Sequence, residues 1–336
     1  MSNTDYIKLC NLFAPVIYLF CKEQYYPSSI DYILENSTLV DENKIVEQKP
    51  IKNETIFDLS INKYKGQTGL TNFYIDIPDS IIHGNKNLSN VPIYCMINEK
   101  DDYFEIIYIA IYPYNGSYNI LGIQKVGQHY GDIEHLTLKV KKTYTGIPQD
   151  IISVMFGSHG TKDGRLVENK DLEFENGKLV AYSARNGHGF YNKPYMAYRF
   201  YGLANDYIEK GKKWIPSEVS MLYRQDNPNF NKTKMGWIYM AGRLGKNGVT
   251  SLSDKYWFYT GESNETLNPP RIYSKNITLI YFFVLYLIIF SVVYGIVRFG
   301  LWQQKIRSQY FFGILIILIL ILIMVAKKLI IKFSNE

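Results

Sequence analysis

The stretch Gly127-Gln-His-Tyr-Gly-Asp-Ile-Glu-His-Leu-Thr-Leu-Lys-Val140 contains the alternation that decides the fold of the first part of the chain. One face of this stretch carries Glu134, Leu136, Leu138 and Val140, and the other face carries His135, Thr137 and Lys139. Alternation with a period of two is typical of a β-strand that is buried on one side. The stretch therefore predicts a strand whose apolar face enters a core.

Further short apolar runs surround this strand. They are Ile106–Tyr112, which runs into Pro113, and the runs Ile151–Phe156 and Lys178–Ser183, each of which is followed by a Gly-bearing loop. Short strands at this spacing, separated by turn residues, favour a sandwich or a barrel. We expect no long amphipathic helix before Arg271, and we therefore predict an all-β fold, a β-sandwich head domain over residues 1–245.

The N-terminal apolar run Leu9–Phe20 is short and is interrupted by Pro15. It is followed by Cys21-Lys-Glu, without the small residues of a cleavage site, so we interpret it as a core strand and not as a signal peptide.

Two long apolar runs dominate the C-terminal part. Residues 277–297 contain no charged residue over 21 positions, and at about 1.5 Å per residue a helix of this length spans roughly 31 Å, the thickness of a bilayer core. Residues 310–326 form a second uncharged run of 17, which Lys327 and Lys328 extend by snorkelling. We predict a linker at 246–276, a transmembrane hairpin of 277–297 and 310–326 joined by the connector 298–309, and a basic tail at 327–336.

Charge supports this division of the chain. The formal net charge is +6, but eight of the 37 basic residues and only one of the 31 acidic residues follow Pro270. The first 270 residues are thus nearly neutral, which argues against a nucleic-acid partner. Five basic residues flank the hairpin on the side of the head, against three in the connector, so an integral membrane protein with a cytosolic head is expected.

The cysteines give no framework of disulfides. Cys10, Cys21 and Cys95 are odd in number and widely spaced, with no Cys-x-x-Cys pair, which fits a reducing compartment. Sequons such as Asn36-Ser-Thr, Asn53-Glu-Thr and Asn276-Ile-Thr are expected by chance in a chain this rich in Asn, and a cytosolic head leaves them unmodified.

The 30 tyrosines, with many Ile, Asn and Lys, are typical of an AT-rich genome such as that of a large DNA virus, a slime mould or a protist.

The carboxylates Asp132 and Glu134 are the strongest candidates for a site, because they share a strand face with Leu136 and Leu138. Two like charges at the mouth of a core are costly unless something neutralises them, and a bound divalent cation would do so. The alternative is an ordinary solvated pair at the start of a strand. Nothing in the sequence supports a nucleotide-binding loop or the Gly-x-Ser-x-Gly turn of a serine hydrolase.

Several motifs resemble the vacuolar protein sorting-associated protein 62 family of fungi and plants. They are Ala14-Pro-Val-Ile-Tyr-Leu-Phe, Tyr26-Pro-Ser-Ser-Ile-Asp-Tyr, Tyr112-Pro-Tyr-Asn-Gly, Val126-Gly-Gln-His-Tyr-Gly-Asp-Ile-Glu-His, Ser158-His-Gly and Ala184-Arg-Asn-Gly-His-Gly. They follow one another in family order from about Phe13 to Tyr223, and Ile133 stands where the family usually has Trp. The resemblance implies a role in vacuolar or endomembrane protein sorting.

The block around Asp132 is also similar to the Gly-His-Arg-His-Asp-Trp-Glu heptapeptide of necrosis- and ethylene-inducing-like cytolysins. Those are secreted β-sandwich proteins that hold a divalent cation and bind a sphingolipid head group. The resemblance implies Asn115, His129, Asp132 and Glu134 as ligands of Ca²⁺ or Mg²⁺. Around such an ion we expect His135, His159 and His188 to support the ligands or to contact a bound ligand.

These observations leave three functions open. The first is a membrane-anchored binding module, inserted through two helices, that recognises a lipid head group, a glycan or a protein cargo. The second is a metal-dependent hydrolase that uses His129, Asp132 and Glu134, with His159 or His188 as a general base. The third is a structural membrane protein whose head keeps the fold and has lost the site. Whether the chain is an enzyme stays open, with binding favoured.

Overall fold

The computed structural model describes residues 2–64, 67, 69–120, 124–158, 164–197 and 205–246, and the single positions 287, 290, 291, 294, 295 and 298. The chain divides into two compact units, one of Met1–Arg199 with Leu203–Arg271 and one of Phe200–Gly202 with Ile272–Glu336. The account of the fold below concerns the first unit.

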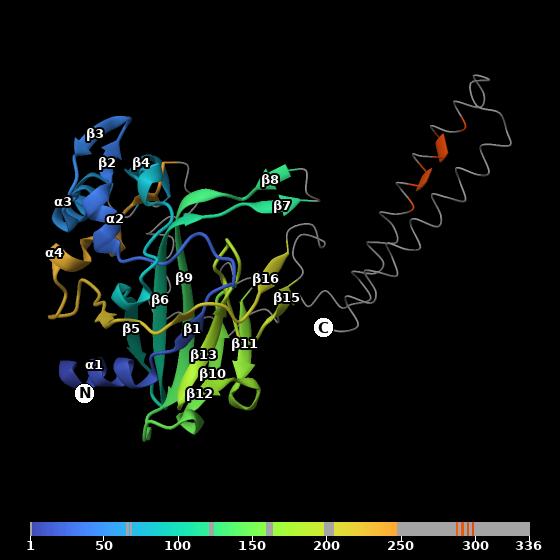
Figure 1. Ribbon diagram of the computed structural model, residues 1–336. Coiled ribbons are helices and arrows are strands. Elements are labelled where there is room, and N and C mark those ends of the chain that lie inside the picture. The colour runs from blue at the N-terminus through green and yellow to red at the C-terminus, as the bar shows by residue number, and fades with distance from the viewer. Residues whose placement is uncertain are drawn as a thin grey trace. The chain divides into compact units, whose positions relative to one another are not determined.

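A six-stranded sheet forms the centre of this unit (Figure 1). Its two longest strands, β6 (Tyr103–Asn115) and β9 (His129–Lys141), run antiparallel side by side along their whole lengths. The order of the sheet is β11 (Arg165–Glu168), β10 (Ile151–Phe156), β9, β6, β5 (Ile93–Glu99) and β18 (Val219–Met221).

A second sheet packs against one face of the first. Its strands are β12 (Phe174–Glu175), β13 (Lys178–Ser183), β1 (Val16–Tyr18) and β17 (Lys213–Trp214), with β14 (Phe190–Tyr191) paired to β13. Alternate residues of β6 and β9, such as Tyr108, Leu136 and Leu138, share one buried cluster with Ile17 and Ala181 of the second sheet. We refer to this cluster as the inter-sheet core, and it makes the two sheets a β-sandwich.

The opposite face of the six-stranded sheet is also covered. Ile109 of β6 and Ile133 of β9 pack there with Ile33, Ile56 and other apolar residues of the helices and of a smaller sheet. These covering elements are α2 (Ile30–Asn36), α3 (Asn53–Asp58), α4 (Lys232–Met235) and the sheet of β19 (Gly242–Leu244), β4 (Leu70–Asp76), β2 (Thr38–Asp41) and β3 (Lys44–Glu47). Because β6 and β9 are covered on both faces, β6 is an almost continuous apolar run.

The remaining elements are short. They are α1 (Asn3–Phe13), the hairpin of β7 (Tyr118–Ile120) and β8 (Gln124–Val126), the pair β15 (Tyr195–Ala197) and β16 (Asp206–Ile208), 3-10 segments at Asp79–Ile81, Leu88–Asn90, Pro148–Asp150, Asn169–Asp171 and Gly236–Tyr239, and a π-helical turn at Leu59–Lys63. The mostly-β prediction is confirmed for the described residues.

Two predicted boundaries are wrong. The run Leu9–Phe20 enters the core as expected, but α1 extends to Phe13 and only Val16–Tyr18 is a strand. Helix α1 begins because the Ser2 side chain caps the Asp5 N–H and the Asp5 carboxylate accepts the Ser2 N–H, a reciprocal pair that alternation alone does not reveal. Strand β6 continues through Pro113, because the ladder resumes beyond it with Asn115 opposite His129.

The interpretation that no disulfide forms is wrong as well. Cys10 of α1 and Cys95 of β5 are joined by a disulfide, and both are fully buried in the inter-sheet core. The bond closes a loop across 85 positions of sequence, so spacing could not reveal it. Among the described residues Cys21 is the free cysteine, and it is exposed.

The predicted transmembrane runs lie almost wholly outside the described residues. At the positions described within the first run the chain is helical, and the Ser291 hydroxyl donates to the Leu287 carbonyl at 2.7 Å. No helix within the described residues is long and apolar enough to cross a membrane.

Reduction of the Cys10–Cys95 bond is expected to lower the free energy of unfolding of the full chain. Chain-entropy reasoning for a loop of this length gives a loss of about 4–5 kcal/mol. Urea titration of the purified chain with and without a reductant measures the difference. The Cys21→Ser variant is the control and should show the same difference, and an unfolding midpoint unaffected by reductant would contradict a formed bond.

Candidate functional site

The carboxylates Asp132 and Glu134 are buried at one end of the sandwich. They lie on the side of β9 that continues as Leu136 into the inter-sheet core, and only 5% and 3% of their surfaces are exposed. The ladder places Asp132 opposite Tyr112 and Glu134 opposite Ala110 on β6. The prediction that the strand period draws both carboxylates toward the core agrees with this burial.

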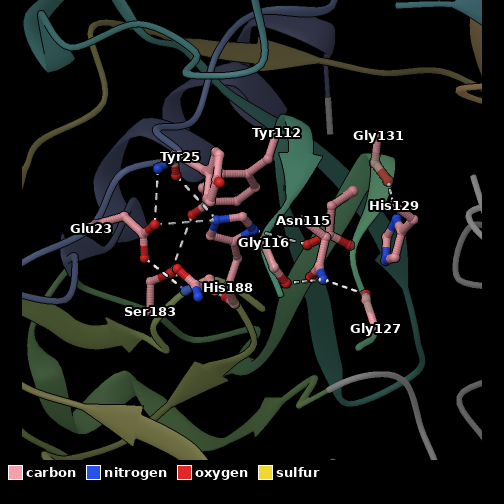
Figure 2. Close-up of polar contacts among 12 residues, drawn as sticks. Glu23, Tyr25, Tyr112, Asn115, Gly116, Gly127, His129, Gly131, Ser183 and His188 are labelled. Carbon is pink, nitrogen blue, oxygen red and sulfur yellow. Dashed lines mark hydrogen bonds and ion pairs between the residues drawn. The ribbon is translucent and has the colours of Figure 1, made fainter. Parts of the chain in front are cut away.

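His188 is the direct partner of Asp132. Its Nδ1 lies 3.0 Å from Asp132 Oδ2, and its Nε2 lies 3.1 Å from the Tyr25 carbonyl oxygen. The imidazole is fully buried and stacks on the Tyr112 ring, with the centroids 3.8 Å apart and the planes 5° apart (Figure 2). His188 thus joins β9, β6 and the loop after β1.

The partners of His188 fix the orientation of its ring. A carbonyl oxygen only accepts hydrogen bonds, so Nε2 carries a hydrogen, and Nδ1 faces the Asp132 carboxyl group. Glu23 Oε1 lies 4.0 Å from the same Nε2, so the imidazole lies between two carboxyl groups. Hydrogen bonds to the ring offset part of the cost of burying these polar groups.

Glu23 fixes the backbone around the imidazole. Its carboxylate accepts the N–H groups of Gln24 at 2.8 Å and Tyr25 at 2.9 Å through Oε1, and that of Asn186 at 2.9 Å through Oε2. These bonds tie the loop after β1 to the loop that holds His188. That second loop contains two left-handed residues, Asn186 with φ 62° and His188 with φ 54°, so its conformation needs such support.

The pKa of the Tyr112 phenol depends on burial and on the nearby carboxylates. Burial raises its pKa well above the ordinary value, and the negative charges of Glu23, Asp132 and Glu134 raise it further, against a lowering by the hydrogen bond with Ser183. Tyr112 therefore stays neutral. We refer to Glu23, Tyr112, Asp132, Glu134 and His188 together as the polar site.

Asn115 and His129 lie one step further along the same ladder, opposite each other (Figure 2). The buried Asn115 donates its Nδ2 hydrogens to the carbonyls of Gly116 and Gly127, both at 2.9 Å, which leaves Oδ1 as its acceptor atom. His129 Nδ1 donates to the Gly131 carbonyl at 2.8 Å, so Nε2 is the nitrogen through which a neutral ring could bind a ligand.

Gly131 changes the phase of β9. Tyr130 packs against the cluster on the far face, whereas Asp132 lies on the side of the inter-sheet core, although strict alternation would place both on one face. The left-handed Gly131 between them, with φ 67°, permits the change, and a Cβ there would lie 2.3 Å from Leu244 Cγ. His129 therefore belongs to the same side of the strand as Asp132.

The other predicted histidines fall in different places. His135 is buried, but the alternation sets it on the opposite face of β9 from Asp132 and Glu134, beside Gly157. His159 lies outside the described residues. The parts of the chain that the structure describes contain no group of three or more His, Cys, Asp or Glu side chains placed to hold a metal ion.

A cluster of half-buried tyrosines flanks the polar site. The ring of Tyr25 lies 4.9 Å from that of Tyr114 and stacks at 5.6 Å on the exposed His83, and Tyr114 lies 5.4 Å from Tyr130. Tyr130 donates its hydroxyl to Asp79 at 2.6 Å, and this bond raises its pKa to about 12. We call Tyr25, Tyr114 and Tyr130 the tyrosine cluster.

Sequence reasoning missed Glu23, Tyr25 and Tyr112. Tyr112 belongs to a motif that was noted, but nothing in its spacing indicates stacking on a histidine 76 positions later. The only sequence feature that points to Glu23 is its position, three residues after the end of the apolar run Leu9–Phe20. Only the parallel pairing of β1 with β13 brings Glu23 to the His188 loop.

Comparison with known proteins identifies relatives. The sequence model of one family, described as Vacuolar protein sorting-associated protein 62, matches residues 1–222. Vacuolar protein sorting-associated protein 62 of Saccharomyces cerevisiae is 23% identical over 276 residues, which is 69% of this chain and 58% of that protein. The putative vacuolar protein sorting-associated protein TDA6 of the same yeast is 23% identical over 277 residues, with the same coverage. The chain thus spans less than two thirds of the length of either relative.

Two solved structures have some similarity to this chain. The non-toxic HaNLP3 protein has a TM-score of 0.36 at 10% identity and covers 69% of this chain and 84% of its own. Necrosis and Ethylene inducing Protein 2, from the causal agent of cocoa's Witches' Broom disease, has a TM-score of 0.33 at 14% identity. The match covers 63% of this chain and 72% of that protein. Similarity at this level carries no argument about the site.

The His188→Asn substitution is expected to destabilise the chain by about 1–3 kcal/mol, because it removes a buried ring that is hydrogen-bonded to Asp132 and to the Tyr25 carbonyl. Asparagine tolerates the left-handed backbone at this position, so the effect isolates the loss of the ring. Urea denaturation measures the free energy of unfolding. The exposed His83→Asn substitution is the control, and a His188→Asn variant as stable as wild type would contradict a stabilising role for the buried ring.

Proposed function

The chain belongs to the vacuolar protein sorting-associated protein 62 family, and we propose that it is a membrane-anchored binding module of an endomembrane compartment. In this proposal the end of the sandwich that carries the polar site and the tyrosine cluster recognises the sugar head group of a glycan or a glycolipid. Membrane anchoring rests on the two apolar runs of the sequence, and the sorting role rests on the family.

The observation that carries the proposal is the juxtaposition of half-buried tyrosine rings with buried, oriented polar groups. Tyr25 belongs to both, since its ring contacts Tyr114 and its carbonyl accepts the His188 Nε2–H. Sites for small ligands combine aromatic surface with a few fixed polar groups. Tyrosine rings offer apolar faces to the C–H faces of sugars, and their hydroxyls offer hydrogen bonds.

We propose further that Asn115, His129, Asp132 and Glu134 hold Ca²⁺ or Mg²⁺ beside this surface. Two features of the structure fit such an ion. His129 donates its Nδ1–H to a backbone carbonyl, as metal-ligating histidines do, and Asn115 has only Oδ1 left to offer. The ion would supply positive charge and coordinate ligand hydroxyls.

The proposed ligands are not preorganised for a metal ion in this structure. Among the described residues, no three His, Cys, Asp or Glu side chains lie close enough together to hold one. Cation binding therefore requires the side chains to converge, at the cost of some affinity. His188, through its bond to Asp132, would hold that carboxylate in orientation.

Hydrolysis is less well supported than binding. Of the two general bases considered for it, His159 lies outside the described residues, and His188 is fully buried, stacked on Tyr112 and engaged at both ring nitrogens. A general base must reach the proton that it removes, directly or through one water. The polar site thus suits a structural and binding role.

Removal of divalent cations is expected to lower the melting temperature of the full chain, because a ligand that binds only the folded state stabilises it. At 100 times its dissociation constant the ion contributes about 2.7 kcal/mol. Melting in EDTA and in excess Ca²⁺ or Mg²⁺ measures the effect. Asp132→Asn should abolish the response, whereas Asp226→Asn, which changes a strongly exposed carboxylate, should retain it. Identical melting of the wild type in EDTA and in cation would contradict the cation site.

Loss of a ring from the tyrosine cluster is expected to weaken glycan binding. We expect the detergent-solubilised full chain to bind immobilised glycans on an array that includes glycosylceramide head groups. Tyr114→Ala should lower that affinity by roughly threefold to tenfold, since an aromatic contact contributes about 0.5–1.5 kcal/mol. Tyr103→Ala, at the opposite end of β6, is the matched control. Absence of any glycan binding would contradict the proposed ligand and favour a protein cargo or a purely structural role.

A further inference from the structure

The buried cystine bears on the compartment in which the head folds. Cys10 and Cys95 are both fully shielded from solvent within the inter-sheet core, and their bond connects α1 to the central sheet. Cytosolic thiols are kept reduced by glutathione and thioredoxin, whereas disulfides form and persist in the secretory pathway and outside the cell. A disulfide at the centre of the fold therefore favours an oxidising compartment.

Two sequons on the surface give independent support. Asn87-Leu-Ser89 and Asn231-Lys-Thr233 have exposed asparagines. In each, the hydroxyl of the third residue donates to the asparagine Oδ1, from Ser89 at 2.7 Å and from Thr233 at 2.8 Å. Neither Asn87 Nδ2 nor Asn231 Nδ2 donates a hydrogen bond to any residue that the structure describes, so the nitrogen that a glycan would occupy is available.

The other sequons of the described head have asparagines that the fold itself uses. Asn115 is buried and donates both Nδ2 hydrogens to carbonyls, and Asn36 donates its Nδ2 to the Tyr32 carbonyl at 2.8 Å. Asn53 is 7% exposed and accepts the Trp237 N–H at 3.1 Å. A glycan is bulky and belongs on the surface, so these three positions do not fit one in the folded chain.

We propose that the head domain matures in the lumen of an oxidising, glycosylating compartment and carries N-linked glycans at Asn87 and Asn231. This replaces the cytosolic location, which rested on a margin of five basic residues to three around the apolar runs. The buried cystine, the exposed sequons at Asn87 and Asn231 and the engagement of the other sequon asparagines by the fold are separate observations, and all of them fit a luminal head.

Both covalent steps use reactants of that compartment. In glycosylation, the asparagine Nδ2 forms a bond to C1 of a lipid-diphosphate oligosaccharide. The C1–O bond to the diphosphate breaks, and the lipid diphosphate leaves as a proton is lost from Nδ2. In disulfide formation, the thiols of Cys10 and Cys95 lose two protons and two electrons to the disulfide of a protein oxidoreductase, which becomes a dithiol.

The test is expression of the full chain in yeast cells, followed by digestion with peptide N-glycosidase and peptide mass spectrometry. The enzyme converts a glycosylated Asn to Asp, so each sequon is read separately, including those outside the described residues. We expect Asp at positions 87 and 231 and Asn at 36, 53 and 115. Ser89→Ala and Thr233→Val should each remove one glycan while leaving the asparagine in place. Ser117→Ala, which removes the Asn115 sequon, should change nothing.

A second readout follows the cysteines. Cells are quenched with a maleimide in denaturant without reductant, and the alkylated thiols of the full chain are counted by mass. One alkylated thiol, at Cys21, is expected. Unmodified asparagine at both 87 and 231, three alkylated thiols, or a glycan at Asn53 or Asn115 would each overturn the proposal.

Discussion

The antiparallel ladder between β6 and β9 is the constraint on which the rest of this head domain depends. It runs in unbroken register from Tyr103 opposite Lys141 to Asn115 opposite His129. One face of the pair fills the inter-sheet core and the other supports the helices, so a slip of one residue would exchange the two sets of side chains. The same register fixes which residues meet at its end, and that end carries the candidate site.

The end of the ladder contains a concentration of negative charge in a dry environment. Glu23, Asp132 and Glu134 are all buried there, and all three act on the Tyr112 phenol. Backbone N–H groups donate to Glu23, and the His188 ring is hydrogen-bonded to Asp132. These interactions offset part of the free-energy cost of burying the carboxylates. A buried pair of this kind adds little net stability compared with apolar packing, but losing one partner is costly. We interpret the polar site as an arrangement that holds carboxylates in place for recognition.

The covalent features support the proposal of a luminal head domain. A cystine in the core and exposed sequons whose amide nitrogens are available fit an oxidising, glycosylating compartment, and aromatic rings beside oriented polar groups fit a ligand site. The family name places its relatives in vacuolar protein sorting. The proposed binding of a head group on the luminal side is compatible with a role in vacuolar protein sorting.

The sequence by itself determined the strand runs within β6, β9, β10 and β13, the mostly-β class, the burial of Asp132 and Glu134 and the family, because each of these depends on patterns within short segments of the chain. The period of two at Glu134 to Val140 was sufficient to place both carboxylates on the core face. Tertiary structure alone decided the Cys10–Cys95 bond and the partners of His188, because those contacts join residues separated by 85 and 56 positions. The helix at Asn3–Phe13 and the phase change at Gly131 have local causes, a capping box and one left-handed glycine, which override the apparent periodicity. Long-range pairing depends on how whole sheets stack, and no pattern within a single strand encodes that distance.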